Sequence, residues 1–133
     1  MEQEHVVRPW GSWTVVDEGE GYKTKRIVVR PGHRLSLQRH AQRKEHWFVV
    51  SGEIEAAIDD VVTTVAEGES VDVPLGASHR LSNPGVAVAV IVEVQQGAYC
   101  DEDDIERLHD DYGRIDSIGQ ADPVIATPRS SPA

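Results

Sequence analysis

The most constraining feature of this chain is a succession of short runs rich in β-branched and aromatic residues, each followed by turn-forming residues. Runs of this length and composition predict β-strands. They cover residues 13–16, 22–30, 34–39, 45–51, 53–58, 61–66, 70–73, 78–81 and 86–94. Ser51-Gly52, Asp59-Asp60 and Asn83-Pro84-Gly85 are typical turn sequences between them. The pattern predicts an all-β fold of short strands.

Two segments depart from the strand pattern. Residues 103–109 predict a short C-terminal helix, because acidic residues would occupy its first turn. Residues 115–133 contain few large apolar side chains, so we expect a flexible C-terminal tail. With 133 residues, 39% of them hydrophobic, the chain is long enough for one core, which we expect within a single domain over residues 1–114.

Composition excludes several classes of function. The net charge of −10 argues against a nucleic-acid partner. The sequence lacks an apolar run of about 18 residues, so we expect no membrane span. Residues 1–5 lack the basic and apolar regions of a signal peptide, so we expect a cytoplasmic protein. Cys100 is the only cysteine, which excludes an internal disulfide and a cysteine zinc site.

Three residues near the middle of the chain are candidate metal ligands. Gln38 and His40 are two positions apart, and side chains at that spacing leave a strand on the same face. Glu45 begins the next predicted strand after a polar turn over residues 41–44. A hairpin there would bring Glu45 opposite His40. The three side chains would then share one face of a sheet.

A fourth candidate ligand, His79, follows a bend at Pro74 and Gly76 that would deliver it from a distant strand. Together, two imidazoles, a carboxylate and an amide oxygen predict one divalent metal ion, namely Zn, Mn, Co, Ni or Fe. Gln38 has an alternative role, which is to orient His40 or to hold a bound water. The alternative for the whole set is a group of polar side chains that only hydrogen-bond to one another.

The spacing of these residues resembles the two signature motifs of the cupin family. The residues that fit the motifs are Gly32, His40, Glu45, Gly52, Gly68, Pro74, Gly76, His79 and Asn83. Gln38 stands where that pattern has its first histidine. The fold implied by the resemblance is a small antiparallel jelly-roll barrel.

A narrower resemblance runs from about Arg8 to Arg114. It is carried by Arg8-Pro-Trp-Gly-Ser-Trp13, Gly21-Tyr-Lys-Thr-Lys-Arg-Ile27, Leu35-Ser-Leu-Gln38, Arg43-Lys-Glu-His-Trp47, Pro74-Leu-Gly-Ala-Ser-His-Arg-Leu81, Glu102-Asp-Asp-Ile105 and Asp110-Asp-Tyr-Gly-Arg114. These blocks look like the type II phosphomannose isomerase domain, which often forms the C-terminal part of a bifunctional enzyme with a mannose 1-phosphate guanylyltransferase. The resemblance implies metal-dependent interconversion of mannose 6-phosphate and fructose 6-phosphate. It also implies that Arg43 and His46 take part in substrate binding and catalysis.

An aldose and a ketose interconvert through an enediol, which requires an electrophile at the carbonyl and a base near the adjacent carbon. A metal ion would supply the electrophile. His46 has a suitable ordinary pKa for the base. Strand alternation, however, places Arg43 and Glu45 on one face and His46 on the other unless a bulge intervenes. Lys25 and metal-bound water are the other acid/base candidates.

The phosphate of such a substrate needs a cationic anchor. Arg43 is favoured because its planar guanidinium can bind two oxygens at once. Lys25, Arg80 and Arg114 are possible partners, and the alternative for each is a surface charge.

Three functions remain open from the sequence. The first is a sugar phosphate isomerase of the phosphomannose type acting on a small phosphorylated sugar. The second is a non-catalytic cupin that binds a sugar, and the third is an isomerase or epimerase acting on a different sugar. Exposed edge strands in a small barrel also lead us to expect a homodimer.

Overall fold

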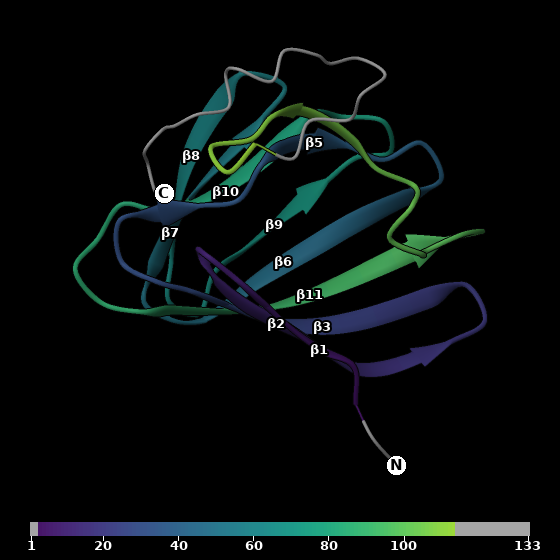
Figure 1. Ribbon diagram of the computed structural model, residues 1–133, viewed down its shortest axis with the longest axis horizontal. Helices are drawn as coiled ribbons and strands as arrows, with labels where there is room; N and C mark the ends of the chain where they lie inside the picture. The colour runs from purple at the N-terminus through teal and green to yellow at the C-terminus, as the bar shows by residue number, and fades with distance from the viewer. Residues whose placement is uncertain (1–2, 114–133) are drawn as a thin grey trace.

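The computed structural model describes residues 3–113, which form two packed antiparallel sheets without a helix (Figure 1). In spatial order, the first sheet contains β1 (His5–Arg8), β2 (Gly11–Gly19), β3 (Tyr22–Val29), β11 (Ala89–Gly97), β6 (Arg43–Ser51) and β9 (Ser70–Val73). The second contains β12 (Glu106–His109), β5 (Leu37–Arg39), β10 (His79–Asn83), β7 (Glu53–Ile58) and β8 (Val61–Ala66), with β4 (His33–Arg34) pairing with β10. The predicted all-β jelly-roll fold is confirmed.

The middle of the chain follows the sequence prediction most closely. The strands predicted at 53–58, 61–66 and 70–73 have those bounds in β7, β8 and β9. The β7–β8 hairpin turns through Asp59 and Asp60, whose φ angles of 47° and 70° suit a two-residue turn. Gly52, at φ 83°, makes the turn between β6 and β7, where a Cβ atom would lie 2.8 Å from the carbonyl oxygen of Val88. That approach excludes a side chain at this position.

The hairpin predicted through residues 41–44 is wrong. β5 and β6 belong to different sheets, so residues 40–42 carry the chain from one sheet to the other. β6 also begins two residues earlier than predicted, at Arg43. β1 was not predicted, although it pairs with β2. A strand of four residues at a sheet edge carries little periodicity, which is why the sequence did not reveal it.

The helix predicted at residues 103–109 is also wrong. Its second half is strand β12, which pairs with β5. Asp104 directs its carboxylate to the backbone amides of Ala41 and Gln42, at 3.1 and 2.9 Å, rather than to amides of its own segment. Asp104 therefore binds this segment to the distant loop at residues 41–42. Composition alone does not distinguish acidic residues that begin a helix from acidic residues that make such a contact.

The barrel interior has an apolar part and a polar part. The buried apolar cluster draws on both sheets and includes Val29, Val49, Ile54, Leu81 and Ile91. Towards the other end of the same strands, inward-facing positions carry buried polar residues. These are Lys23, Lys25, Arg43, Glu45, His79, Glu93 and Gln95. The polar part of the interior positions the candidate site.

The tail predicted at 115–133 and the residue Arg114 lie outside the described residues. Within residues 3–113, no helix is long and apolar enough to cross a membrane.

Candidate metal centre

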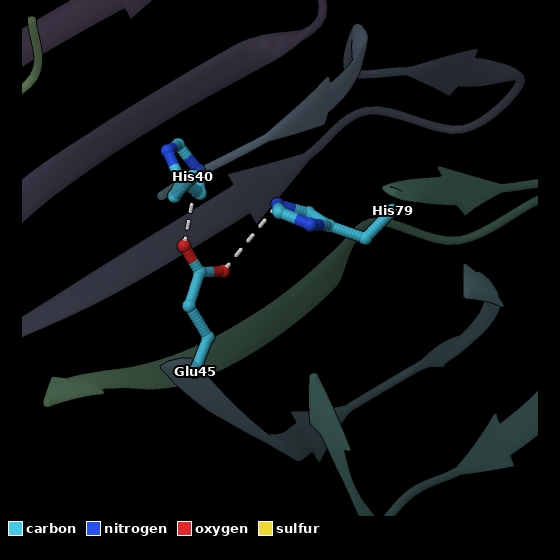
Figure 2. A group of neighbouring side chains, drawn as sticks. All are labelled: His40, Glu45 and His79. Atoms are coloured by element: carbon cyan, nitrogen blue, oxygen red, sulfur yellow. Dashed lines mark ion pairs between the residues drawn. The ribbon is translucent and has the colours of Figure 1, made fainter. Parts of the chain in front are cut away.

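Three of the four predicted ligands meet inside the barrel. His40 lies in the loop between β5 and β6, Glu45 lies on β6 of the first sheet, and His79 begins β10 of the second sheet. The loop and both sheets therefore each contribute one residue to the cluster. Figure 2 shows the Glu45 carboxylate pointing between the two imidazoles, with Oε2 3.2 Å from His40 Nε2 and Oε1 3.8 Å from His79 Nε2. Ligand atoms of the three residues lie within 4.8 Å of one another, and all three residues are buried. The cluster could hold a metal ion.

Both histidines present a lone pair to this centre. His40 Nδ1 lies 2.5 Å from the carbonyl oxygen of Asp104, and His79 Nδ1 lies 3.1 Å from that of Ala77. Because a carbonyl oxygen only accepts hydrogen bonds, each Nδ1 carries the hydrogen and each Nε2 is the potential ligand. Burial and the nearby Arg43 charge lower the pKa of His40 to about 4, and burial lowers the pKa of His79. Both rings are neutral near pH 7, as metal ligation requires.

Gln38 lies beside this cluster on β5, directly opposite His79 in the ladder. Its Nε2 donates a hydrogen bond to Ser36 Oγ at 2.9 Å, which leaves the amide oxygen as the ligand atom. Gln38, Glu45 and His79 border a cavity of about 20 Å³, a volume sufficient for one ion or water. This arrangement fits a Gln38 that binds the ion directly and also one that orients a ligand or holds a bound water.

Arg43 connects the cluster to a second, larger space. Its side chain is 3% exposed, Nε donates to Glu45 Oε2 at 3.1 Å, and Nη2 donates to His40 Nε2 at 3.0 Å. Nη1 donates to the carbonyl oxygens of Cys100 and Asp101, both at 3.3 Å. Burial opposes the charge, but nearby carboxylates, that of Glu45 foremost, outweigh it and raise the pKa of Arg43. The guanidinium therefore stays charged inside the barrel.

The larger cavity, of about 110 Å³, adjoins the small one and is lined by many charged groups. Its cations are Arg8, Lys25, Arg43 and Arg107. Lys25 Nζ bonds Glu102 Oε2 at 2.5 Å and lies 3.8 Å from the centroid of the Trp13 ring. Sequence reasoning identified Lys25 and Arg43 but missed Arg8 and Arg107. Single arginines give no sequence signal that separates a cavity from a surface.

Glu93 is a further buried residue that the sequence analysis did not single out. It borders both cavities, and its carboxylate accepts hydrogen bonds from Trp47 Nε1 at 3.3 Å and Gln95 Nε2 at 2.9 Å. Burial, with the Glu45 carboxylate nearby, raises the pKa of Glu93 to about 7. A signal was available, because Glu93 and Gln95 share the inward parity of Ile91.

Trp10 and Gln95 line the larger cavity, and each has a buried polar atom without a hydrogen-bond partner among the described residues. These atoms are the donor Trp10 Nε1 and the acceptor Gln95 Oε1. Buried polar groups are normally paired, so both atoms suit hydrogen bonds to a polar ligand. A molecule carrying hydroxyl groups can serve a donor and an acceptor together.

Two predicted site residues lie elsewhere. His46 points to the outer face of the first sheet, as strand alternation indicates, where Nδ1 lies 2.6 Å from Asp72 Oδ1. No bulge returns it to the interior, because β6 keeps a regular register there with β9 and β11. Arg80 donates to the carbonyl oxygen of Leu35 and contacts His109, and it borders neither cavity. The structure therefore does not bring His46 or Arg80 to the site.

Solved structures with similar folds cover most of the chain. Oxalate decarboxylase from Bacillus subtilis matches with a TM-score of 0.72 at 19% identity, covering 80% of this chain and 30% of that one. A cupin-superfamily sugar phosphate isomerase from Silicibacter pomeroyi matches with a TM-score of 0.61 at 17% identity, covering 71% of each chain. At these identities the likeness concerns the fold, which is that of a cupin.

Sequence relatives are much closer. Over 109 residues the chain is 51% identical to alginate biosynthesis protein AlgA of Pseudomonas aeruginosa, covering 82% of this chain and 23% of the relative. It is 46% identical over 110 residues to mannose-1-phosphate guanylyltransferase of Escherichia coli, covering 83% of this chain and 23% of the relative. The chain thus spans about a quarter of the length of these relatives.

A family model described as "Mannose-6-phosphate isomerase C-terminal" matches residues 1–110. The matched segment contains both cavities and all three residues of the metal cluster. The chain belongs to the family of mannose-6-phosphate isomerase C-terminal domains.

Proposed function

We propose that this protein is a metal-dependent isomerase that interconverts mannose 6-phosphate and fructose 6-phosphate. The observation that carries the proposal is the position of the His40–Glu45–His79 cluster next to a cavity that is lined by several cationic side chains, Lys25 and Arg43 among them. A sugar phosphate has matching parts: hydroxyl groups, an anionic group and a carbonyl oxygen. Family membership supports the same substrate class.

In this proposal the metal ligands are His40, Glu45 and His79, with Gln38 as a fourth ligand or as an orienting neighbour. The neutral Nε2 atoms and the carboxylate fit Zn, Mn, Co, Ni or Fe. The bound ion would act as a Lewis acid towards the carbonyl oxygen of the sugar. The carbonyl oxygens of Asp104 and Ala77 keep both imidazoles in the tautomer that ligation needs.

The larger cavity would hold the rest of the sugar phosphate. Arg43 and Lys25 are buried there, and they would bind phosphate oxygens. Trp10 Nε1 and Gln95 Oε1 would hydrogen-bond sugar hydroxyls. The apolar side chains of Ile27 and Leu35 close part of the cavity wall and would exclude water from the bound substrate.

Isomerisation also needs a group that moves a proton between two carbons. His46 is on the wrong side of the sheet for this role. Glu93 is the one carboxyl-bearing residue, among those described, that lines both cavities, and its carboxylate would receive and return the proton. Lys25 Nζ remains the second candidate, held by Glu102 at the cavity.

The test is turnover in deuterated water. Chain freed of metal with EDTA and reloaded with each candidate ion should convert mannose 6-phosphate to fructose 6-phosphate. Deuterium should appear at C1 of the product to the extent that the transferred proton exchanges with solvent. His79→Ala serves as the control, with little conversion expected. Binding of both metal and sugar phosphate without conversion, for every ion, would overturn the isomerase proposal.

The outward position of His46 favours a second candidate, a cupin that binds a phosphorylated sugar without converting it. The same experiment separates the two functions, because a binding protein would retain the sugar phosphate unchanged. An isomerase or epimerase for another sugar would instead leave mannose 6-phosphate intact while converting a related substrate. The expected homodimer stays a prediction.

A further inference from the structure

Arg43 and a metal ion would use the same atom of His40. The Nδ1 hydrogen of His40 is donated to the Asp104 carbonyl, so Nε2 has a single lone pair to offer. Arg43 Nη2 donates to this atom at 3.0 Å. One lone pair cannot both accept that hydrogen bond and coordinate an ion, so the two contacts exclude each other.

The guanidinium of Arg43 also supplies the positive charge that a bound metal ion would supply between His40 and Glu45. His40 Nε2 and Glu45 Oε2 are both acceptors and lie only 3.2 Å apart, an arrangement that needs a positive group beside it. Arg43 provides this group by donating Nε to Glu45 and Nη2 to His40. An incoming ion would take over the role at His40 and release Nη2.

The released Nη2 belongs to a residue that lines an adjoining cavity. Arg43 lines the 110 Å³ cavity, where Lys25 supplies a second buried cation. A buried donor without an acceptor is costly, so the freed Nη2 favours an acceptor from the cavity. Nη2 is a charged N–H donor, and an oxygen of a tetrahedral anion can accept from it while Nε stays on Glu45 and Nη1 stays on the carbonyl oxygens of Cys100 and Asp101.

We propose that a divalent metal ion displaces Arg43 Nη2 from His40 and that the freed Nη2 then binds an anion in the larger cavity. Metal ion and anion therefore bind with positive coupling through Arg43. By linkage, each ligand raises the affinity for the other by the same factor, which for coupled sites is typically about 5- to 150-fold. The inference rests on the metal site of the proposed function and adds how its two ligands depend on each other.

The first experiment measures the coupling in the full chain by calorimetry, with Zn²⁺ as the metal and sulfate as the anion. Sulfate is a tetrahedral dianion and a weak zinc ligand, so it reports on the cations of the cavity. Titrations at constant ionic strength should give tighter sulfate binding with Zn²⁺ than after EDTA treatment. Zn²⁺ affinity should rise with sulfate by the same factor. Equal sulfate affinities in the two states would overturn the inference.

Matched variants identify the residue responsible. Arg43→Met removes the competing donor, so Zn²⁺ should bind roughly tenfold or more tightly, as expected from losing one charge-assisted hydrogen bond. The gain in sulfate affinity on adding Zn²⁺ should disappear. Lys25→Met removes another buried cation of this cavity, one that donates to Glu102 and not to His40, and should keep the coupling factor. A gain that persists in Arg43→Met would mean that sulfate coordinates the ion directly, which overturns the inference.

The wild-type chain gives a readout that does not depend on a folded variant. Side-chain NMR signals of Arg43 should shift when Zn²⁺ is added and shift again with sulfate. Signals that stay unchanged on saturation with Zn²⁺ would contradict displacement. Absence of Zn²⁺ binding would remove both the inference and the proposed function, whereas Zn²⁺ binding and turnover without coupling would remove the inference alone.

Discussion

The two ends of the barrel interior differ in chemistry but not in burial. Along β6, the inward-facing side chains run from Arg43 and Glu45 at one end to Val49 at the other, and all are at most 4% exposed. β11 runs antiparallel beside it, so Glu93 lies opposite Trp47 and Ile91 opposite Val49. The same strand alternation therefore builds an apolar core at one end and a ligand site at the other. Burial alone cannot distinguish them; the residue types can.

The apolar end of the barrel should determine the stability of the fold without affecting Zn²⁺ affinity. Ile91→Ala removes a fully buried side chain and should lower the free energy of unfolding by about 2 to 5 kcal/mol. Urea unfolding followed by tryptophan fluorescence measures this loss. Zn²⁺ affinity of the folded variant should stay unchanged. A large loss of Zn²⁺ affinity in folded Ile91→Ala would show that the two ends are mechanically coupled.

The polar end should show the opposite behaviour. His79→Ala removes one of three converging ligand atoms and should weaken Zn²⁺ binding about a hundredfold or more. This exceeds the loss of about 10- to 100-fold that is typical when a residue that only hydrogen-bonds to a metal ligand is replaced. Calorimetry measures the affinity, and unfolding in EDTA measures the stability. The loss of stability in EDTA should be smaller than in Ile91→Ala. Unchanged Zn²⁺ affinity would exclude this cluster as the metal site.

Gln38 allows a finer distinction within the polar end. Gln38→Ala should lower Zn²⁺ affinity by roughly tenfold if the amide only orients a ligand. That value is the lower end of the range for residues that contact a metal ligand but not the ion. Replacement by glutamate should strengthen binding only if position 38 contacts the ion, because a carboxylate is the stronger ligand. Calorimetry on both variants decides between the two roles. Equal affinities in wild type and both variants would remove Gln38 from the site.

Sequence alone predicted the strands and the ligands better than the connections and the cavity. Alternation and turn residues recovered β7 to β9, and residue spacing brought His40, Glu45 and His79 together. The hairpin through residues 41–44 and the helix at 103–109 failed because both depend on which distant segment a chain contacts. Local pattern carries no information on that choice.

The residues around the cavity illustrate the same limit. Glu93 could have been inferred, since a charged residue at an inward position of an apolar strand must have a buried partner or a function. Arg107 could not, because its place follows from the pairing of β12 with β5. The outward direction of His46 was predictable from alternation in β6. Strand parity alone therefore predicted the direction of this side chain.

A charge pair outside the barrel interior provides the smallest predicted effect and a reference for the other variants. Arg34 on β4 donates Nε and Nη2 to the two oxygens of Asp111, at 2.7 and 2.9 Å. The hydrogen bond from Arg34 holds the pKa of Asp111 below its ordinary value of 3.8. In the native state this carboxylate therefore releases its proton more readily than in the unfolded chain. Its stabilising contribution is present above pH 3.8 and is lost as the pH falls through the lower native pKa.

Asp111→Asn should consequently cost about 1 kcal/mol at pH 7, a modest value because Arg34 is partly exposed and water screens the pair. The difference from wild type should shrink below pH 3.8 as Asp111 itself is protonated. Urea unfolding across this range measures it. Zn²⁺ affinity should not change, because this pair lies apart from both cavities. A cost that is the same at every pH would assign the loss to packing rather than to charge, and altered Zn²⁺ affinity would extend the polar site beyond the barrel interior.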